Sequence, residues 1–304
     1  MKQAPVVLGI DVGGTAIAAG AVDATGRVLR ATVEPARDPA AIVEQIIACA
    51  RSFEDLIPIA IGLGVPGAVE AKTGRVIGEV FNLPALTDFP LGAHLRKKLR
   101  RSVVVDNDVN ALALGELRWG AVKGRRDFVL IAVGTGVGGA IVLDGKLRRG
   151  AHGFAGELGH ATVNFRGRDC FCGAVGCLKA YAAGPDLAAQ FGNPMLTSEQ
   201  VVAAARAGNR RARVVLDTAA HALGAACANL VHTLDPELIV LGGSVARGLP
   251  LATIRSYAKQ HTLSGVRGRT PIVLSKLNKR RAFLGAAALA WDHCKPNPNR
   301  RSEP

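Results

Sequence analysis

One short stretch of the chain carries the residue types of a metal site. The spacing is H-x9-C-x-C-x4-C, formed by His160, Cys170, Cys172 and Cys177. Three thiolates and an imidazole are the donor set of a closed tetrahedral zinc site, which is structural because no coordination position stays open for a substrate. The alternative interpretation is a group of free buried thiols. The other three of the six cysteines are scattered, so the cluster favours metal.

A second group of polar side chains lies where a predicted strand, 103–105, meets a predicted helix, 109–119. The group comprises Asp106, Asn107, Asp108 and Asn110. A helix N-cap needs only one such residue, whereas α/β proteins commonly bind ligands at strand-to-helix junctions. Asp108, at the positive end of the helix, would stay ionised and could accept a proton from a hydroxyl that attacks phosphorus. Asn107 can donate and accept hydrogen bonds, which suits a hydroxyl-rich ligand.

Three glycine-rich turns could hold phosphate, because glycine lets backbone N–H groups converge on an anion. One turn alone is weak evidence, since hairpins need glycine for their own geometry. Two equivalent turns in a duplicated unit are stronger evidence, because they could grip a triphosphate from both sides. None matches a P-loop, and the turn at 134–139 precedes an apolar run rather than a helix, which excludes a dinucleotide fingerprint. The turn residues are Gly13, Gly14 and Thr15; Gly134, Thr135 and Gly136; and Gly242 and Gly243.

Asp11 ends the strand-like run before the first of these turns. A carboxylate in that position is costly unless it has a partner, and a hydrated Mg²⁺ that bridges phosphate oxygens would be one. The alternative is a structural aspartate that accepts N–H bonds from its own turn. We favour the metal role.

The elements that must position these residues form a repeating pattern. The runs 6–10 and 17–22 predict a strand, a tight turn and a second strand, and the pattern returns about 120 residues later at 128–133 and 140–143. Strands and helices alternate in the rest of the chain, so the predicted class is α/β with mixed sheets. The other expected helices are 40–53, 91–99, 197–207, 211–234 and 284–291, and the other expected strands are 59–64, 238–241 and 272–274.

Composition limits the class of protein. The 304 residues are 49% apolar and 20% charged, which excludes a disordered chain, and a mass of 31.5 kDa favours two lobes. Lys and Arg number 38 against 24 Asp and Glu, a net charge of +14. We interpret this excess as solvated helix faces rather than a nucleic-acid surface, because only 4% of residues are aromatic and no stacking platform is evident. The charge should still steer anionic ligands.

No segment predicts membrane insertion or export. The longest uncharged apolar run, 128–143, has 16 residues and four glycines, so it is too short and too flexible to span a bilayer. The first residues lead directly into a strand-like run and lack the parts of a signal peptide. We therefore expect a soluble, cytoplasmic protein.

Together, these motifs resemble the ROK family (repressor, open reading frame, kinase) of sugar kinases, from Val6 to about Trp291. The resemblance implies the duplicated actin-like, hexokinase-like (ribonuclease H-like) fold, with two lobes of mixed sheets and a cleft between them for ATP and sugar. It rests on Asp11-Val12-Gly13-Gly14-Thr15, Gly62-x-Gly64-x-Pro66-Gly67, Asn82-Leu83-Pro84, Asn107-Asp108-x-Asn110, Gly134-Thr135-Gly136-x-Gly138-Gly139, Gly156-Glu157-x-Gly159-His160, Cys170-x-Cys172-Gly173-x-x-Gly176-Cys177 and Gly242-Gly243.

The lobe boundaries expected on this basis are 1–118 for a small lobe and 119–283 for a large lobe. The helix near 284–292 should pack back on the small lobe, and the zinc loop, 160–177, belongs to the large one. A tail at 295–304 is expected to be disordered.

The resemblance also implies roles for single residues. Asp108 looks like the catalytic base, and His160 would serve both zinc and substrate. Family members are often homodimers, so a homodimer is expected. A repressor would carry an N-terminal winged helix-turn-helix; ten residues precede Asp11, so DNA binding is disfavoured. The implied sugar ligands are Asn82, Asn107, Glu157 and His160, and the implied ATP contacts are Asp11 (through Mg²⁺), Gly13, Gly14, Thr15, Gly134, Thr135, Gly136, Gly242 and Gly243.

Three positions depart from the family pattern. Lys179 stands where the family usually has a Glu that accepts a sugar hydroxyl, so a substrate-facing acceptor has become a cationic donor, or the side chain turns outward. Ala16 replaces a common Lys after the first turn. The segment 278–281 is basic where relatives often carry acidic residues.

The expected activity is ATP-dependent phosphorylation of a hexose or N-acetylhexosamine at the 6-hydroxyl, with glucose as the first choice and with Mg²⁺ and a structural Zn²⁺ as cofactors. One alternative is a kinase for N-acetylglucosamine or N-acetylmannosamine. The net charge motivates a second, a glucokinase that uses polyphosphate. Lys179 motivates a third, a sugar-binding sensor with weak turnover.

Overall fold

The computed structural model describes residues 4–277 and 282–294. The expected disordered tail at 295–304 and the basic segment 278–281 lie outside these residues. The chain divides into two compact units. Unit 1 consists of the described residues of Met1–Lys123, Gly150–Phe154 and Lys279–Pro304, and unit 2 of those of Gly124–Arg149 and Ala155–Asn278.

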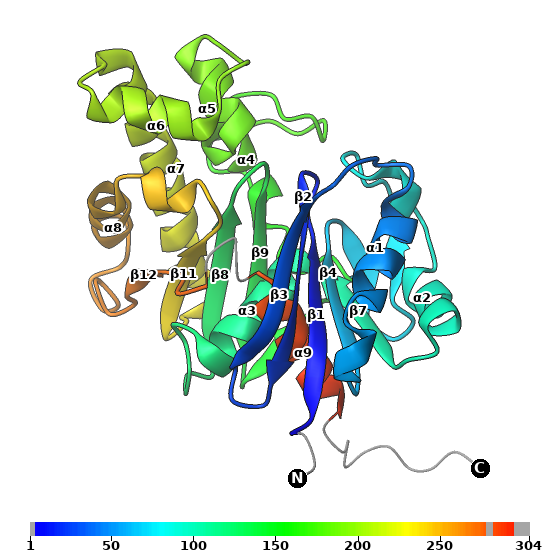
Figure 1. Ribbon diagram of the computed structural model, residues 1–304. Helices are drawn as coiled ribbons and strands as arrows, with labels where there is room; N and C mark the ends of the chain where they lie inside the picture. Colours follow the sequence, from blue (N-terminus) through cyan, green and yellow to red (C-terminus); the bar gives the residue numbers. More distant parts are fainter. Residues whose placement is uncertain (1–3, 278–281, 295–304) are drawn as a thin grey trace. The chain divides into compact units, whose positions relative to one another are not determined.

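Unit 1 is built on a five-stranded sheet with the strand order β3-β2-β1-β4-β7 (Figure 1). The first three strands are antiparallel neighbours, and β1, β4 and β7 are parallel. A two-stranded ribbon, β5-β6, is added to it. The elements are β1 (Val6–Val12), β2 (Ala16–Asp23), β3 (Val28–Pro35), α1 (Ile42–Arg51), β4 (Ile61–Val65), β5 (Ala68–Glu70), β6 (Arg75–Ile77), α2 (Leu91–Leu99), β7 (Val103–Asn107), α3 (Asp108–Trp119) and α9 (Phe283–Cys294), with 3₁₀ turns at Glu54–Leu56 and Pro84–Leu86.

Unit 2 repeats this plan with the order β10-β9-β8-β11-β12. Again the first three strands are antiparallel neighbours and the last three are parallel, which confirms the predicted α/β class with mixed sheets. The elements are β8 (Phe128–Val133), β9 (Val137–Leu143), β10 (Lys146–Arg148), α4 (Lys179–Ala182), α5 (Gly184–Phe191), α6 (Ser198–Arg206), α7 (Arg210–Leu234), β11 (Leu238–Gly242), α8 (Leu251–Gln260) and β12 (Ile272–Leu274), with 3₁₀ turns at Leu158–His160 and Ala246–Gly248.

Helix α9 packs directly on the sheet of unit 1, at strand positions that have no side chain. A Cβ built on Gly62 of β4 would lie 1.9 Å from the Ala286 carbonyl oxygen, and one on Gly9 of β1 would lie 2.1 Å from that of Phe283. Successive strand residues face opposite sides of a sheet. The neighbours of these glycines, such as Leu8 and Leu63, therefore join the core on the other face, which α1 and α2 cover.

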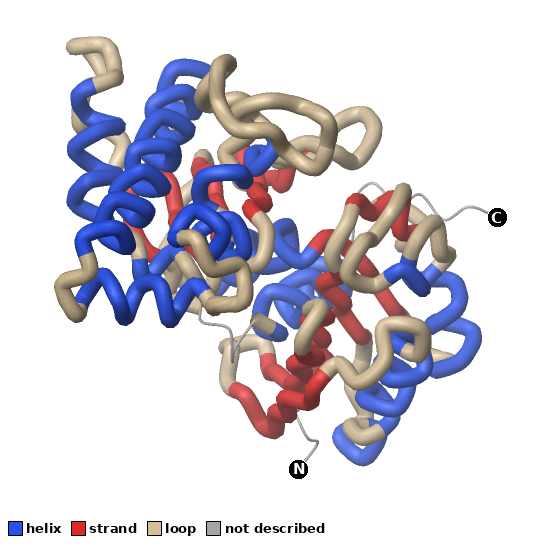
Figure 2. The backbone as a smooth tube through the Cα atoms, turned by 90° about the horizontal axis from the view of Figure 1, so that it is seen from above, coloured by secondary structure: helices blue, strands red, loops and turns tan. Residues whose placement is uncertain are grey.

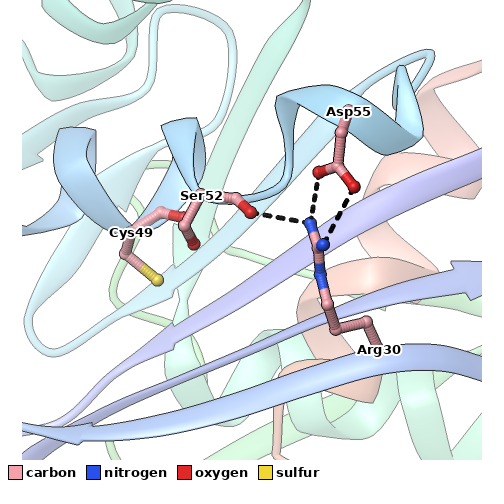
Figure 3. A network of polar contacts seen from close by, with 4 residues as sticks. All are labelled: Arg30, Cys49, Ser52 and Asp55. Carbon is pink, nitrogen blue, oxygen red and sulfur yellow. Dashed lines mark hydrogen bonds and ion pairs between the residues drawn. The ribbon is translucent and has the colours of Figure 1, made fainter.

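One arginine joins edge strand β3 to the segment that directly follows α1 (Figure 3). The Arg30 guanidinium donates hydrogen bonds of 2.6 and 3.0 Å to the Asp55 carboxylate and one of 2.6 Å to the Ser52 carbonyl, and it lies 4.6 Å from the Phe53 ring centroid. The Arg30 contact lowers the pKa of Asp55. Leu29, Ala31 and Val33 lie on the other, exposed face of β3; Val33 is 56% exposed.

The core of unit 2 forms where α4 to α8 gather against the strands (Figure 2). Alternate residues of β8 and β11, including Ile131 and Leu241, join one buried cluster with α7. By length and composition, α7 is apolar enough to cross a membrane, but 61% of its most apolar window is buried in the protein. It is therefore a core helix.

The contact of α9 with β4 yields a stability prediction. Gly62→Ala should destabilise unit 1 by about 3 kcal/mol or more, because the new methyl group would meet backbone rather than a side chain that can move. Both tryptophans, Trp119 and Trp291, lie in unit 1, so urea unfolding followed by tryptophan fluorescence measures the effect. The control is Lys97→Ala on α2 of the same unit, an exposed residue whose substitution should change stability by about 0.5 kcal/mol at most. Equal stability of the two variants would contradict the close packing.

Candidate active site

In unit 1, the parallel strands β1, β4 and β7 end at the same edge of the sheet. Their register pairs Asp11 with Gly64 and Gly64 with Asp106. A Cβ built on Gly64 would lie 3.5 Å from the Asp11 Oδ1 and 3.2 Å from the Asp108 Cα. The predicted metal ligand and the predicted base therefore both contact this one glycine. A larger residue there would separate or displace them.

The junction of β7 and α3 is held by hydrogen bonds. The N-cap is Asn107, whose Oδ1 accepts from the Val109 and Asn110 backbone N–H groups at 2.9 and 3.1 Å. Its Nδ2 donates to the Gly67 carbonyl at 3.1 Å. One N–H of the side-chain amide that was expected to bind the substrate is therefore engaged within the protein. Asp106 is buried and accepts from the Asn107 N–H and from the Asn110 side chain. Asn107 thus supplies the cap, and Asp108 is the first residue of α3.

Asn82 lies beside the first glycine turn. The turn closes through a 2.9 Å hydrogen bond from the Gly13 N–H to the Ala16 carbonyl. A Cβ on Gly14 would lie 3.3 Å from the Asn82 Cβ. Asn82, Gly14 and Thr15 are exposed. Unit 1 therefore places Asp11, the first turn, Asn82, Asn107 and Asp108 around one sheet edge.

The two glycine turns of unit 2 contact each other after β8 and β11. The Gly134 N–H donates to the Gly136 carbonyl at 2.8 Å. Gly243 has a positive φ of 86°, and a Cβ there would lie 2.2 Å from the Val133 carbonyl oxygen, so only glycine fits. The Ser244 Oγ lies 3.9 Å from a Cβ built on Gly134. Ser244 thus lies against both turns. In the sequence it is marked only as a polar residue that follows two glycines.

Glu157 and His160 are positioned by glycines that press against β9. A Cβ on Gly159 would lie 1.9 Å from the Val137 carbonyl oxygen, and one on Gly156, whose φ is 96°, would lie 2.5 Å from the Gly139 carbonyl oxygen. Val137 is the first residue of β9, directly after the second turn. Glu157 is exposed and His160 half-buried. Unit 2 therefore holds both residues close to its glycine turn at 134–136.

The four predicted metal ligands converge. Their donor atoms all lie within 4.8 Å of one another. The Cys172 and Cys177 sulfurs are 3.7 Å apart, and the Cys170 sulfur is 3.8 Å from the His160 Nδ1. Zn–S bonds of about 2.3 Å in a tetrahedron put neighbouring sulfurs about 3.8 Å apart. The donor set and its spacing thus fit zinc, with Nδ1 as the ligand nitrogen.

The thiols of the cluster differ in acidity. Hydrogen bonding from the Ala174 backbone, and then from Cys170, lowers the pKa of the exposed Cys172 to about 6. Burial raises the pKa of Cys177 to about 12, and Cys172 adds to this shift. Binding of a metal would therefore displace protons, above all from Cys177.

Lys179 begins α4 two residues after Cys177. Its Nζ forms an ion pair with the Asp186 Oδ2 at 3.0 Å and lies 4.8 Å from the Phe171 ring centroid. The Phe171 ring meets the His160 ring edge-on, with centroids 5.5 Å apart. Asp186 and Phe171 were not identified from the sequence, because Asp186 lies in no motif and Phe171 is only a variable position between two of the cysteines.

Similarity to known proteins extends along almost the whole chain. Residues 7–293 match the ROK family. The chain is 37% identical over 283 residues to a glucokinase of Halalkalibacterium halodurans, covering 84% of each protein. It is 33% identical over 254 residues to a xylose repressor of Caldicellulosiruptor bescii, covering 76% of this chain and 62% of the repressor.

A solved structure shares the arrangement of both sheets. The crystal structure of a ROK family glucokinase from Streptomyces griseus in complex with glucose and AMPPNP matches with a TM-score of 0.82 and 33% identity, covering 94% of this chain and 99% of that one. This match, together with the two sheets of like topology, confirms the expected actin-like fold.

The cysteine environments predict an order of alkylation. In metal-free protein, iodoacetamide should label Cys172 first, with a rate that rises through about pH 6, because the thiolate is the reactive form. Cys177 and Cys227, whose pKa values burial raises to about 12, should stay unlabelled at pH 7. Exposed Cys294, whose pKa burial also raises, is the internal control and should react more slowly than Cys172.

Mass spectrometry of the labelled peptides measures this order. One equivalent of zinc should protect Cys172 and leave Cys294 labelled as before. Labelling of Cys172 that needs pH 8 or above, or that zinc does not slow, would contradict the assigned cluster.

Proposed function

From the premise that this chain belongs to the ROK family, we propose that it is a sugar kinase that transfers the γ-phosphoryl group of ATP to the 6-hydroxyl of glucose. The relatives named glucokinase, and the glucokinase solved with glucose and AMPPNP, support this choice of substrates. A cytoplasmic homodimer is part of the proposal. So are the sugar-ligand roles of Asn82, Glu157 and His160, and that of Asn107 through the second N–H of its side-chain amide.

The observation that carries the proposal is the position of Asp108. It is the first residue of α3, beside Asp11 across Gly64. The positive end of a helix stabilises a carboxylate, so Asp108 is available as an anion at neutral pH. In the proposed step, its carboxylate accepts the proton of the sugar hydroxyl as that oxygen bonds to the γ-phosphorus and the bond to ADP breaks.

Backbone groups supply most of the proposed stabilisation. Phosphoryl transfer demands positioning and charge neutralisation rather than covalent chemistry. The turns at 13–15, 134–136 and 242–243 offer N–H groups without side chains that would block an anion. When bound, Mg²⁺ would neutralise phosphate charge, and Asp11 would hold it through its hydration shell.

His160 can serve a metal and a sugar at once. Its Nδ1 points to the Cys170 sulfur, so Nε2 is the nitrogen that would carry the proton and donate to a sugar hydroxyl. A zinc ion bound by His160, Cys170, Cys172 and Cys177 would fix the orientation of this ring. The proposed zinc is therefore structural and acts through the histidine.

The catalytic proposal is tested at Asp108. Asp108→Asn should lower kcat by about 10²–10⁴-fold, the contribution of a general base, and should leave glucose affinity within a few-fold of wild type. Coupled ADP release measures kcat, and isothermal titration measures glucose binding. The matched control is Glu44→Gln on α1, an exposed carboxylate that should leave both unchanged. Turnover near wild type in Asp108→Asn would refute the assignment.

A sensor without turnover is the second candidate, because a xylose repressor is among the relatives and Lys179 is engaged by Asp186. It predicts that glucose raises the melting temperature while no ADP is released at any ATP concentration. The same assay with polyphosphate in place of ATP tests the other donor. Rapid ADP release with ATP and glucose would remove the sensor.

A further inference from the structure

The Lys179 ammonium links two segments of unit 2. It lies over the ring of Phe171, the residue that separates Cys170 from Cys172 in the sequence. It also pairs with Asp186 in the first turn of α5. The two charged side chains are only 20% and 24% exposed. They are thus partly shielded from water, where an ion pair is stronger than at an open surface.

Asp186 stands near the second phosphate turn. The Gly184 N–H, at the start of α5, donates to the Gly134 carbonyl at 2.8 Å. Asp186 follows two residues later in the same helical turn, which places its Cα within about 9 Å of that carbonyl. The Asp186 backbone thus lies about one Debye length or less from the turn at physiological salt, so that an unpaired carboxylate on this residue would repel the phosphates of a nucleotide held there.

We propose that Lys179 is a positioning residue of the nucleotide site: its charge cancels that of Asp186, so that the Gly134–Gly136 turn can accept the ATP phosphates. The inference rests on the proposed function, because it takes this turn as a phosphate site. It assigns Lys179 to the nucleotide rather than to a sugar hydroxyl. On this assignment, having Lys179 where the family usually has a Glu changes the affinity for the nucleotide and does not change the affinity for the sugar.

The test compares ADP affinity in four variants by isothermal titration. Lys179→Met should weaken ADP binding about 10-fold, because it exposes the phosphates to an uncompensated carboxylate. Lys179→Arg keeps the ion pair and should bind within about twofold of wild type. Asp186→Asn should bind as tightly as wild type or tighter. The double variant Lys179→Met/Asp186→Asn should regain wild-type affinity within about threefold, since both charges are gone.

Two further readouts separate this role from a merely structural one. The defect of Lys179→Met should shrink to less than about threefold at 0.5 M salt, because salt screens the repulsion. In turnover assays, KM for ATP should rise while KM for glucose changes less than about twofold. The control is Arg148→Met, which breaks the more exposed Arg148–Asp144 pair of the same unit and should leave ADP affinity unchanged.

The outcomes are distinguishable from failure of the kinase proposal. Wild-type protein that neither binds ADP nor releases it from ATP would overturn the function and this inference together. Wild-type protein that does both, with Lys179→Met binding ADP equally well or with no rescue in the double variant, would overturn this inference alone. A higher KM for glucose in Lys179→Met, with ADP affinity unchanged, would return Lys179 to the sugar.

Discussion

In each unit, the candidate functional residues depend on backbone contacts that leave no room for a side chain. In unit 2, Gly243 meets the Val133 carbonyl, and the segment with Glu157 and His160 lies on β9 through Gly156 and Gly159. In unit 1, Gly64 separates Asp11 from Asp108 by no more than its own backbone. The candidate functional side chains are therefore placed by residues that have no side chain of their own.

The second feature of the site is its balance of charge. The proposed reaction would bring anionic phosphates close to the carboxylates of Asp11 and Asp108, which is an electrostatic conflict. Unit 1 resolves this conflict with the start of α3, where the helix dipole stabilises Asp108. In unit 2, the proposed counterpart is the ion pair of Lys179 with Asp186, which offsets the charge of that carboxylate. The net charge of +14 acts at longer range, as a field that attracts anions.

Much of this architecture could be predicted from local sequence. The strands 128–133 and 272–274 and the helix 91–99 have the predicted bounds, because apolar runs between glycine turns and amphipathic periods mark them. Strand β3 could not be predicted, since Arg30 and Glu34 occupy its inward face while Val33 points outward, the reverse of the usual pattern. Helix α8 begins after Pro250 without a side-chain cap, so no start signal marks it.

The metal cluster could be predicted, because its ligands are close in sequence. The contacts of Asp186, Ser244 and Gly64 are tertiary, and no spacing encodes them.

The packing of α9 on β1 and β4 has a consequence for biosynthesis. Unit 1 combines the first strands of the chain with a helix translated more than 150 residues after α3. During translation, the glycine-lined face of β1 and β4 stays uncovered until unit 2 and then α9 have been synthesised. We infer that unit 2 can reach its native state first, and that chaperones which shield apolar sheets will act on the amino-terminal region of nascent chains.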